Sequence, residues 1–126
     1  MNKGQRLYKF ILGLLMPFLF LACSSKERIK IDGGTFNVDG KDVQLICGEM
    51  HYARIPHEYW RDRLKRARAM GLNTISVYVF WNFHERQPGE FDFSGQADVA
   101  EFVRLAQEEG LYVILRPGPY ACAEWD

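Results

Sequence analysis

The sequence has no excess charge of either sign, because its 126 residues include 16 lysines and arginines and 16 aspartates and glutamates. A balanced charge argues against nucleic acid or an anionic membrane surface as the natural partner. The chain also lacks a glycine-rich phosphate loop. Its three histidines, His51, His57 and His84, do not have the close spacing of metal chelates. These absences argue against a nucleic-acid-binding protein and give no sign of a phosphate or metal site.

No apolar run is long enough to span a bilayer comfortably. The longest, Phe10 to Ala22, has 13 residues and follows a basic segment. This layout is typical of an export signal, and the ending Leu21-Ala22-Cys23 resembles a bacterial lipoprotein signal. We therefore expect residues 1–22 to be a signal peptide, Cys23 to be acylated, and residues 23–28 to form a tether.

An ordinary cleaved signal peptide is the alternative, and in either case the protein is exported. With an acylated Cys23, we expect a membrane-anchored bacterial lipoprotein in the periplasm or at the cell surface. Its only attachment to the membrane would be the lipid anchor.

Cysteine is scarce: apart from Cys23, the chain contains only Cys47 and Cys122. An exported protein could join these two in a disulfide. We place Cys47 in the first strand of a parallel sheet and Cys122 just after the third. Strands that are not neighbours lie about 9 to 10 Å apart, beyond the reach of an unstrained bridge. We therefore expect both cysteines to be unpaired and mostly buried.

A short antiparallel segment is expected near the start of the mature chain. The sequence predicts strands over Ile29–Ile31 and Thr35–Val38, and Asp39-Gly40 is a strong signal for a two-residue hairpin turn. The run Val43–Cys47 that follows is apolar except at Gln44, which predicts a strand covered on both faces.

Helix and strand patterns then alternate along the rest of the chain. In order, they predict a helix, a strand, a helix and a strand over His57–Met70, Thr74–Val79, Ala97–Glu109 and Leu111–Leu115. Trp60, Leu64 and Ala67 form the apolar stripe of the first helix, and Gly71 and Gly110 suit the helix ends. This alternation predicts a parallel sheet with helical crossovers.

Side chains suited to chemistry follow the second and third strands of this predicted sheet. The segments after the strands are 81–85 and 117–125, and the aromatic residues at these strand ends are Tyr78, Trp81, Phe83, Tyr120 and Trp125. Residues just past the C-terminal ends of parallel strands form the active site of a (β/α) barrel. Aromatic walls beside carboxylates suit a sugar, whose ring has apolar faces and a polar rim.

Three carboxylates, Glu49, Glu85 and Glu124, lie at or just past predicted strand ends. Glycoside hydrolysis needs two carboxyl groups across one bond, and Glu85 with Glu124 is one candidate pair. The alternative is that these acids bind hydroxyl groups or brace arginines such as Arg116.

Five segments together carry a family resemblance. They are Gly48–Pro56, Tyr59–Leu64, Gly71–Thr74, Tyr78–Glu85 and Leu115–Trp125. In this order and spacing they resemble the N-terminal part of the catalytic domain of glycoside hydrolase family 35, the β-galactosidases. The resemblance covers residues 29–126, with Phe80 in place of the proline that is usual in the family's Tyr-Val-Pro-Trp-Asn motif.

The resemblance implies a fold and an activity. The fold is a partial (β/α)8 TIM barrel, truncated after its first three βα units and preceded by a short β-hairpin. The activity is that of an exported retaining exo-β-galactosidase, which removes terminal β-D-galactose from oligosaccharides or glycans without a cofactor.

The resemblance also implies site residues: Tyr78, Cys122 and Ala123 (the last two chiefly through backbone), and Glu124 contact terminal galactose. The family's acid/base and nucleophile glutamates follow the fourth and seventh strands. Glu85 and Glu124 are therefore expected to position substrate rather than react. The chain alone, without the two reacting glutamates, is expected to be inactive.

Two other hypotheses stay open. One is a non-catalytic, truncated remnant of such an enzyme, which an in-frame Asn-Glu-Tyr motif further along the gene would argue against. The other is a different barrel hydrolase that binds a metal through His51 and His84, which a metal assay on purified protein would test.

The Cys23→Ala substitution should release the protein from the membrane fraction, because it removes the residue that would carry the acyl chains. Fractionation of cells that express the precursor, followed by immunoblotting, measures this, and Ser25→Ala is the matched control that should stay with the membrane. Unchanged membrane association of the Cys23→Ala protein would contradict the lipoprotein assignment.

Overall fold

The computed structural model of the protein describes residues 28–118. It divides into two units, one ending at Val43 and the other beginning at Gln44. The predicted signal peptide, Cys23, and the predicted substrate contacts Cys122, Ala123 and Glu124 lie outside the described residues. Within residues 28–118, no helix is long and apolar enough to cross a bilayer.

The first unit is a three-stranded antiparallel sheet of β1 (Ile29–Asp32), β2 (Thr35–Val38) and β3 (Lys41–Val43). Val38 pairs with Lys41, so Asp39 and Gly40 form a two-residue turn. Both have positive φ, 51° and 84°, as the type I′ hairpin turn requires. The predicted hairpin is therefore confirmed.

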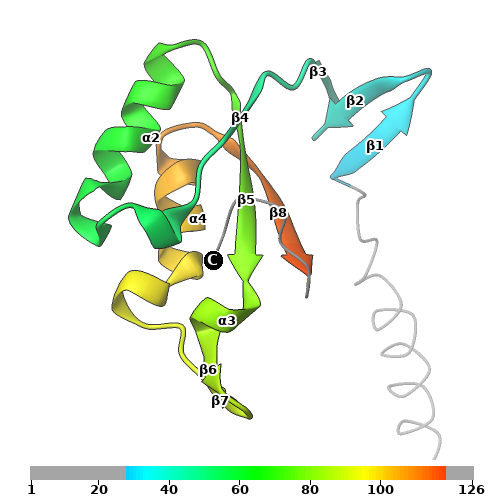
Figure 1. Ribbon diagram of the computed structural model, residues 1–126. Helices are drawn as coiled ribbons and strands as arrows, with labels where there is room; N and C mark the ends of the chain where they lie inside the picture. Colours follow the sequence, from blue (N-terminus) through cyan, green and yellow to red (C-terminus); the bar gives the residue numbers. More distant parts are fainter. Residues whose placement is uncertain (1–27, 119–126) are drawn as a thin grey trace, which may run out of the picture. The chain divides into compact units, whose positions relative to one another are not determined.

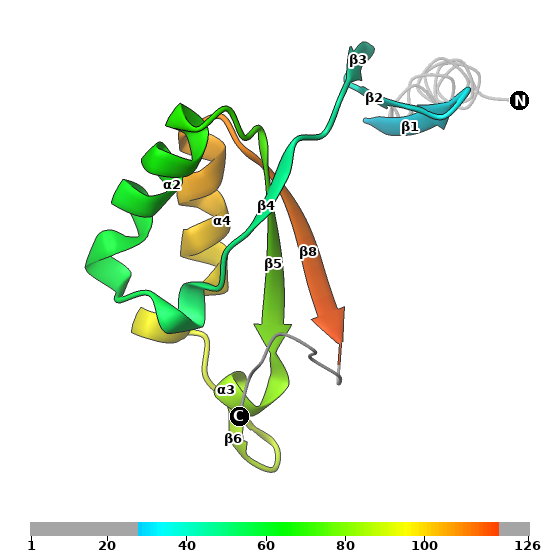
Figure 2. The ribbon, with the colours of Figure 1, turned by 45° about the horizontal axis from the view of Figure 1, so that its top comes forward.

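The second unit contains a parallel sheet, two main helices and a small hairpin. Its elements in chain order are β4 (Cys47–Glu49), η2 (Tyr52–Arg54), η3 (His57–Tyr59), α2 (Trp60–Ala69), β5 (Thr74–Phe80), α3 (Trp81–His84), β6 (Glu85–Gln87), β7 (Glu90–Phe91), η4 (Gly95–Ala97), α4 (Val99–Glu108) and β8 (Tyr112–Gly118). The strand order is β4-β5-β8, and both pairings are parallel. Figures 1 and 2 show α2 and α4 side by side on one face of this sheet. The predicted alternation with parallel pairing is confirmed.

The core of this unit lies between the helices and the sheet. The stripe predicted for the first helix is buried, with Trp60 and Leu64 fully covered and Ala67 nearly so. From β5, Ile75 and Val77 enter the same cluster. The helix begins at Trp60 rather than at His57, because residues 57–59 form a turn of 3₁₀ helix first. Gly71 and Gly110 follow the two helices with φ of 94° and 73°, a conformation that glycine adopts without strain.

The arginines of α2 lie outside this core and have acidic partners. Arg61 forms ion pairs with Glu108, the last residue of α4, and with Glu109 just after it, the second at 2.6 Å. Arg66 bonds Asp62 one turn earlier at 2.8 Å. These arginines thus form a charged outer face on α2, and Arg61 helps to join it to α4.

The strand predicted over Val43–Cys47 is wrong. Val43 ends β3, and the parallel strand β4 begins only at Cys47. Between them the backbone bonds to a side chain: Asn73 Nδ2 donates to the Gln44 carbonyl at 2.7 Å, and Asn73 Oδ1 accepts from the Ile46 amide at 2.8 Å. These bonds take the place of a strand pairing.

The expected burial of Cys47 is also wrong. Cys47 is free, as expected, but exposed, and Ile46 beside it is half exposed. The reason is that β4 and β8 are the outer strands of the described sheet, whereas β5 lies between them. Tyr112, Ile114 and Leu115 of β8 are exposed for the same reason.

The segment after β5 is made of short regular elements. The one-turn helix α3 leads into the antiparallel hairpin of β6 and β7, whose turn contains Gly89 with φ of 83°. Glu85 fixes the turn, because its Oε1 accepts from the Gly89 amide at 2.7 Å and its Oε2 accepts from Trp81 Nε1.

The Asn73→Ala substitution should destabilise the protein, because it removes the side-chain bonds to Gln44, Ile46 and the Thr74 hydroxyl. The site is half-buried, so we expect a loss of about 1–3 kcal/mol in the free energy of unfolding. Urea denaturation of the full-length protein that carries this sequence measures it. Asn37→Ala, which removes one exposed bond to Asp42, is the control and should cost less than about 1 kcal/mol. Equal losses in the two variants would contradict the prediction.

Candidate functional site

The sheet has two faces of different character near its C-terminal edge. Successive side chains of a strand point to opposite faces. Ile75 and Val77 of β5 point into the helix-covered core, so Tyr78 and Phe80 lie on the other face. Arg116 of β8, which pairs in register with Tyr78, joins them there.

Tyr78 is the central residue of this face. It is 8% exposed, and the Arg116 guanidinium carbon lies 3.9 Å from the centre of its ring. The ring of His51 lies 5.7 Å away, centre to centre, and that of Phe80 lies 5.8 Å away. Within residues 28–118, the Tyr78 hydroxyl makes no hydrogen bond. Arg116 covers one face of the Tyr78 ring.

One carboxylate links the charged groups around Tyr78. Glu49 Oε1 lies 3.3 Å from His51 Nε2 and 3.6 Å from Arg116 Nη1. Of the alternatives predicted for the strand-end acids, Glu49 therefore takes the one in which it braces Arg116. We call Glu49, His51, Tyr78 and Arg116 the Tyr78 cluster.

His51 carries a buried nitrogen. Its Nδ1 is inaccessible and has no hydrogen-bond partner in the described part of the chain. Burial lowers the pKa of His51, the Glu49 charge opposes this, and the Arg54 and Arg116 charges lower the pKa further. Burial thus favours the neutral form of the imidazole, whose Nε2 faces Glu49.

His84 belongs to a different network. Its Nδ1 donates to the Asp92 carbonyl at 2.8 Å, so its Nε2 is an acceptor and takes a hydrogen bond from the Tyr52 hydroxyl. Both residues are buried, and burial raises the pKa of Tyr52 to about 12. With both ring nitrogens used, His84 holds the loop after α3 in place.

The two histidines of the metal hypothesis therefore have separate partners. Across residues 28–118, no group of three His, Cys, Asp or Glu side chains is arranged to hold a metal ion.

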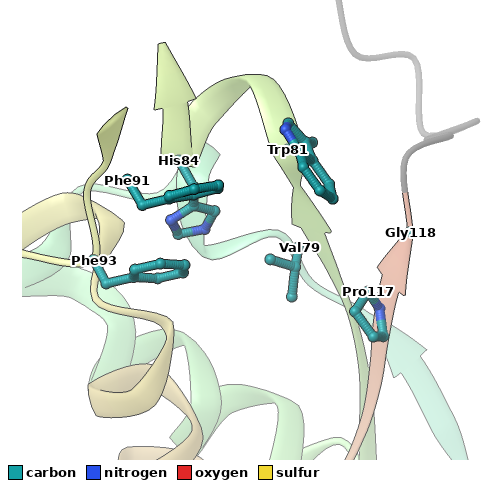
Figure 3. A pocket seen from close by; sticks show the side chains of 7 residues that line it. All are labelled: Val79, Trp81, His84, Phe91, Phe93, Pro117 and Gly118. Carbon is teal, nitrogen blue, oxygen red and sulfur yellow. The ribbon is translucent and has the colours of Figure 1, made fainter. Parts of the chain in front are cut away.

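Of the five aromatic residues predicted at the strand ends, Tyr120 and Trp125 lie outside the described residues. The other three, Tyr78, Trp81 and Phe83, do not gather on one face of the sheet. Trp81 contributes to an apolar pocket of about 300 Å³ on the other side of β5 from Tyr78, shown in Figure 3. Its lining residues are Val79, Trp81, His84, Phe91, Phe93, Pro117 and Gly118. Val79 and Pro117 directly follow Tyr78 and Arg116 along their strands, and successive side chains point to opposite faces. The pocket and Tyr78 therefore lie on different faces of the sheet. Phe83 packs against the core and Tyr52 instead.

The Tyr78 cluster contains two residues whose part in it sequence reasoning missed. Arg116 was predicted only as a possible partner of an acid, and His51 was considered as a possible metal ligand. A count from the helix-ending glycines comes close but misses the register by one residue, because Tyr78 is seven residues after Gly71 and Arg116 is six after Gly110. The pairing of Tyr78 with Arg116 therefore comes from the structure.

Solved structures with a similar fold identify the architecture to which this part of the chain belongs. The solved structures that it resembles are TIM-barrel glycosidases. One is the beta-galactosidase from the psychrophilic Marinomonas ef1, at a TM-score of 0.51 and 25% identity, which covers 57% of this chain and 11% of that one. The unit that begins at Gln44 is a mixed α/β part of that fold.

The sequence comparisons give the family. The profile of Glycosyl hydrolases family 35 matches residues 35–126, and the chain belongs to this family. It is 54% identical over 115 residues to a beta-galactosidase of Xanthomonas manihotis and 57% identical over 120 residues to one of Bos taurus. These alignments cover 91% and 90% of this chain, which spans only 19% and 18% of the length of those relatives.

The pH dependence of stability should carry a contribution from His51. Because its native pKa is lowered, the unfolded chain binds more protons than the native protein below the ordinary histidine pKa of 6.5. Stability should therefore fall as the pH is lowered through 6.5 toward the native value, and His51→Gln should reduce this fall. Urea denaturation of both proteins at a series of pH values measures it. The same pH dependence in both would contradict the prediction.

Proposed function

We propose that this chain is the front, substrate-binding part of a retaining exo-β-galactosidase that removes terminal β-D-galactose from oligosaccharides or glycans. The observation that carries the proposal is the family match over residues 35–126, together with relatives named beta-galactosidase at more than half identity. The proposal includes no cofactor. It assigns the chain to the first three βα units of the barrel, behind an export signal and a lipid anchor at Cys23.

In this proposal Tyr78 contacts the galactose through its hydroxyl. Three features support the role: the residue lies near the C-terminal end of β5, its hydroxyl has no partner within residues 28–118, and its ring is held by Arg116. A hydrogen bond from an already ordered side chain costs less conformational entropy on binding than one from a mobile side chain. Because Arg116 covers one face of the ring, we assign Tyr78 a hydrogen bond to a sugar hydroxyl rather than a stacking role.

Cys122, Ala123 and Glu124 complete the proposed contacts, the first two through their backbone. Glu124 accepts hydrogen bonds from sugar hydroxyls, and bonds to a charged carboxylate are worth about 1.5–3 kcal/mol each. Glu49 and Glu85 already have partners in the protein, at Arg116 and in the β6–β7 turn. We place the acid/base and nucleophile glutamates on later strands of the barrel.

The full-length protein that carries this sequence should hydrolyse a chromogenic β-galactoside, and Glu124→Gln should lower its kcat/KM by about one to two decades. The substitution keeps the shape of the side chain and removes the charge that holds the sugar. Glu58→Gln, an exposed site on η3, is the matched control and should leave kcat/KM unchanged.

Azide separates the two possible roles of Glu124, because a small nucleophile rescues an enzyme that has lost a reacting carboxylate. Azide should not restore turnover to Glu124→Ala. Formation of a galactosyl azide by that variant would make Glu124 a reacting residue. Failure of the wild-type protein to hydrolyse any β-galactoside would refute the proposed function itself.

A further inference from the structure

We propose that Arg116, held by Glu49, is a positioning residue that fixes the side chain of Tyr78 for its contact with the substrate. The inference rests on the proposed function in one respect, since it takes Tyr78 to be the residue that meets the sugar. It adds two residues, one on each outer strand of the described sheet, that act through Tyr78 and need not touch the ligand.

The contact between Arg116 and Tyr78 is close and follows directly from the strand register. The two residues are paired on adjacent strands, and the guanidinium carbon lies 3.9 Å from the ring centre. A guanidinium over an aromatic face is attracted by the negative charge of the ring. The planar group also blocks the side of the ring that it covers, which limits rotation of Tyr78 about its side-chain bonds.

Glu49 holds Arg116 over the ring from the opposite edge of the same face of the sheet. β4 and β8 are not neighbours, so the 3.6 Å contact between Glu49 Oε1 and Arg116 Nη1 crosses the central strand β5. The same oxygen lies 3.3 Å from His51 Nε2, and His51 in turn lies beside Tyr78. Three strands therefore contribute to the surroundings of a single tyrosine ring.

Stability alone does not account for this arrangement. The side chains of Glu49 and Arg116 are both more than 40% exposed, and exposed ion pairs at such distances contribute little to folding. The Tyr78 hydroxyl has no hydrogen bond within residues 28–118 that would orient it. Within residues 28–118, the contacts of the ring with Arg116, His51 and Phe80 set its direction. What the Glu49–Arg116 pair supplies is orientation.

A double-mutant cycle on the full-length protein tests the proposal through kcat/KM for a β-galactoside. Arg116→Met keeps much of the side-chain length and removes the charge and the planar group, and Tyr78→Phe removes only the hydroxyl. If Arg116 acts through that hydroxyl, Arg116→Met should lower kcat/KM by roughly tenfold in the wild-type background. In the Tyr78→Phe background it should lower it by less than about twofold. Equal reductions in both backgrounds would overturn the proposal.

Two further variants keep the test decisive. Arg104→Met removes an exposed arginine that also pairs with carboxylates, on α4, and should leave kcat/KM unchanged in both backgrounds. Glu49→Gln should show the same dependence on the Tyr78 hydroxyl as Arg116→Met, with a smaller effect. If Arg116→Met does not fold, the cycle with Glu49→Gln decides by the same criterion.

A structural measurement separates failure of this inference from failure of the proposed function. In crystals of the Arg116→Met protein, or of Glu49→Gln if the first does not fold, the Tyr78 side chain should occupy a different rotamer or more than one. This result does not depend on activity. A Tyr78 side chain that stays in its wild-type position would overturn the positioning role. If the wild-type protein had no β-galactosidase activity but Tyr78 were displaced in the variant, only the proposed function would be refuted.

Discussion

The side chain and backbone of Asn73 tie together the N-terminal ends of the three parallel strands. The side chain bonds the chain at Gln44 and Ile46, just before β4 begins. The Asn73 backbone amide donates to the Ile46 carbonyl at 3.1 Å, and its carbonyl accepts from the Tyr112 amide, the first residue of β8, at 2.8 Å. One residue thus sets the starting point of all three strands. Since register is carried unchanged along a parallel ladder, it also sets which residues meet at the other end.

That constraint explains how far the sequence predicts the fold. The helix-ending glycines, the buried stripe of α2, the type I′ turn at Asp39-Gly40 and the strand β5 follow from local patterns, and each is found in the structure. The break between β3 and β4 does not follow, because an apolar run cannot reveal that its backbone is bonded by an amide side chain from a residue 27 positions later. The exposure of β8 depends likewise on which strands neighbour it, and not on its own residues.

The candidate site shows the same division between local and long-range information. Alternation along β5 places Tyr78 and Phe80 on the face away from Ile75 and Val77. Alternation ends where the strand ends, and α3 then turns Trp81 toward the apolar pocket of Figure 3. Tyr78 and Trp81, which are close in sequence, therefore lie on different faces of the sheet. Glu49, His51 and Arg116, which are distant in sequence, surround Tyr78 because the register brings them there.

The two faces of β5 serve different purposes, and their chemistry differs accordingly. The face with Ile75 and Val77 is dry and stabilises the unit by burial of apolar surface. The face with Tyr78 carries an arginine, a glutamate and a histidine whose exposed ion pairs add little stability. Its groups are nevertheless held in register, because the apolar face and the Asn73 bonds fix the strands that bear them. Stability supplied on one face therefore provides order on the other.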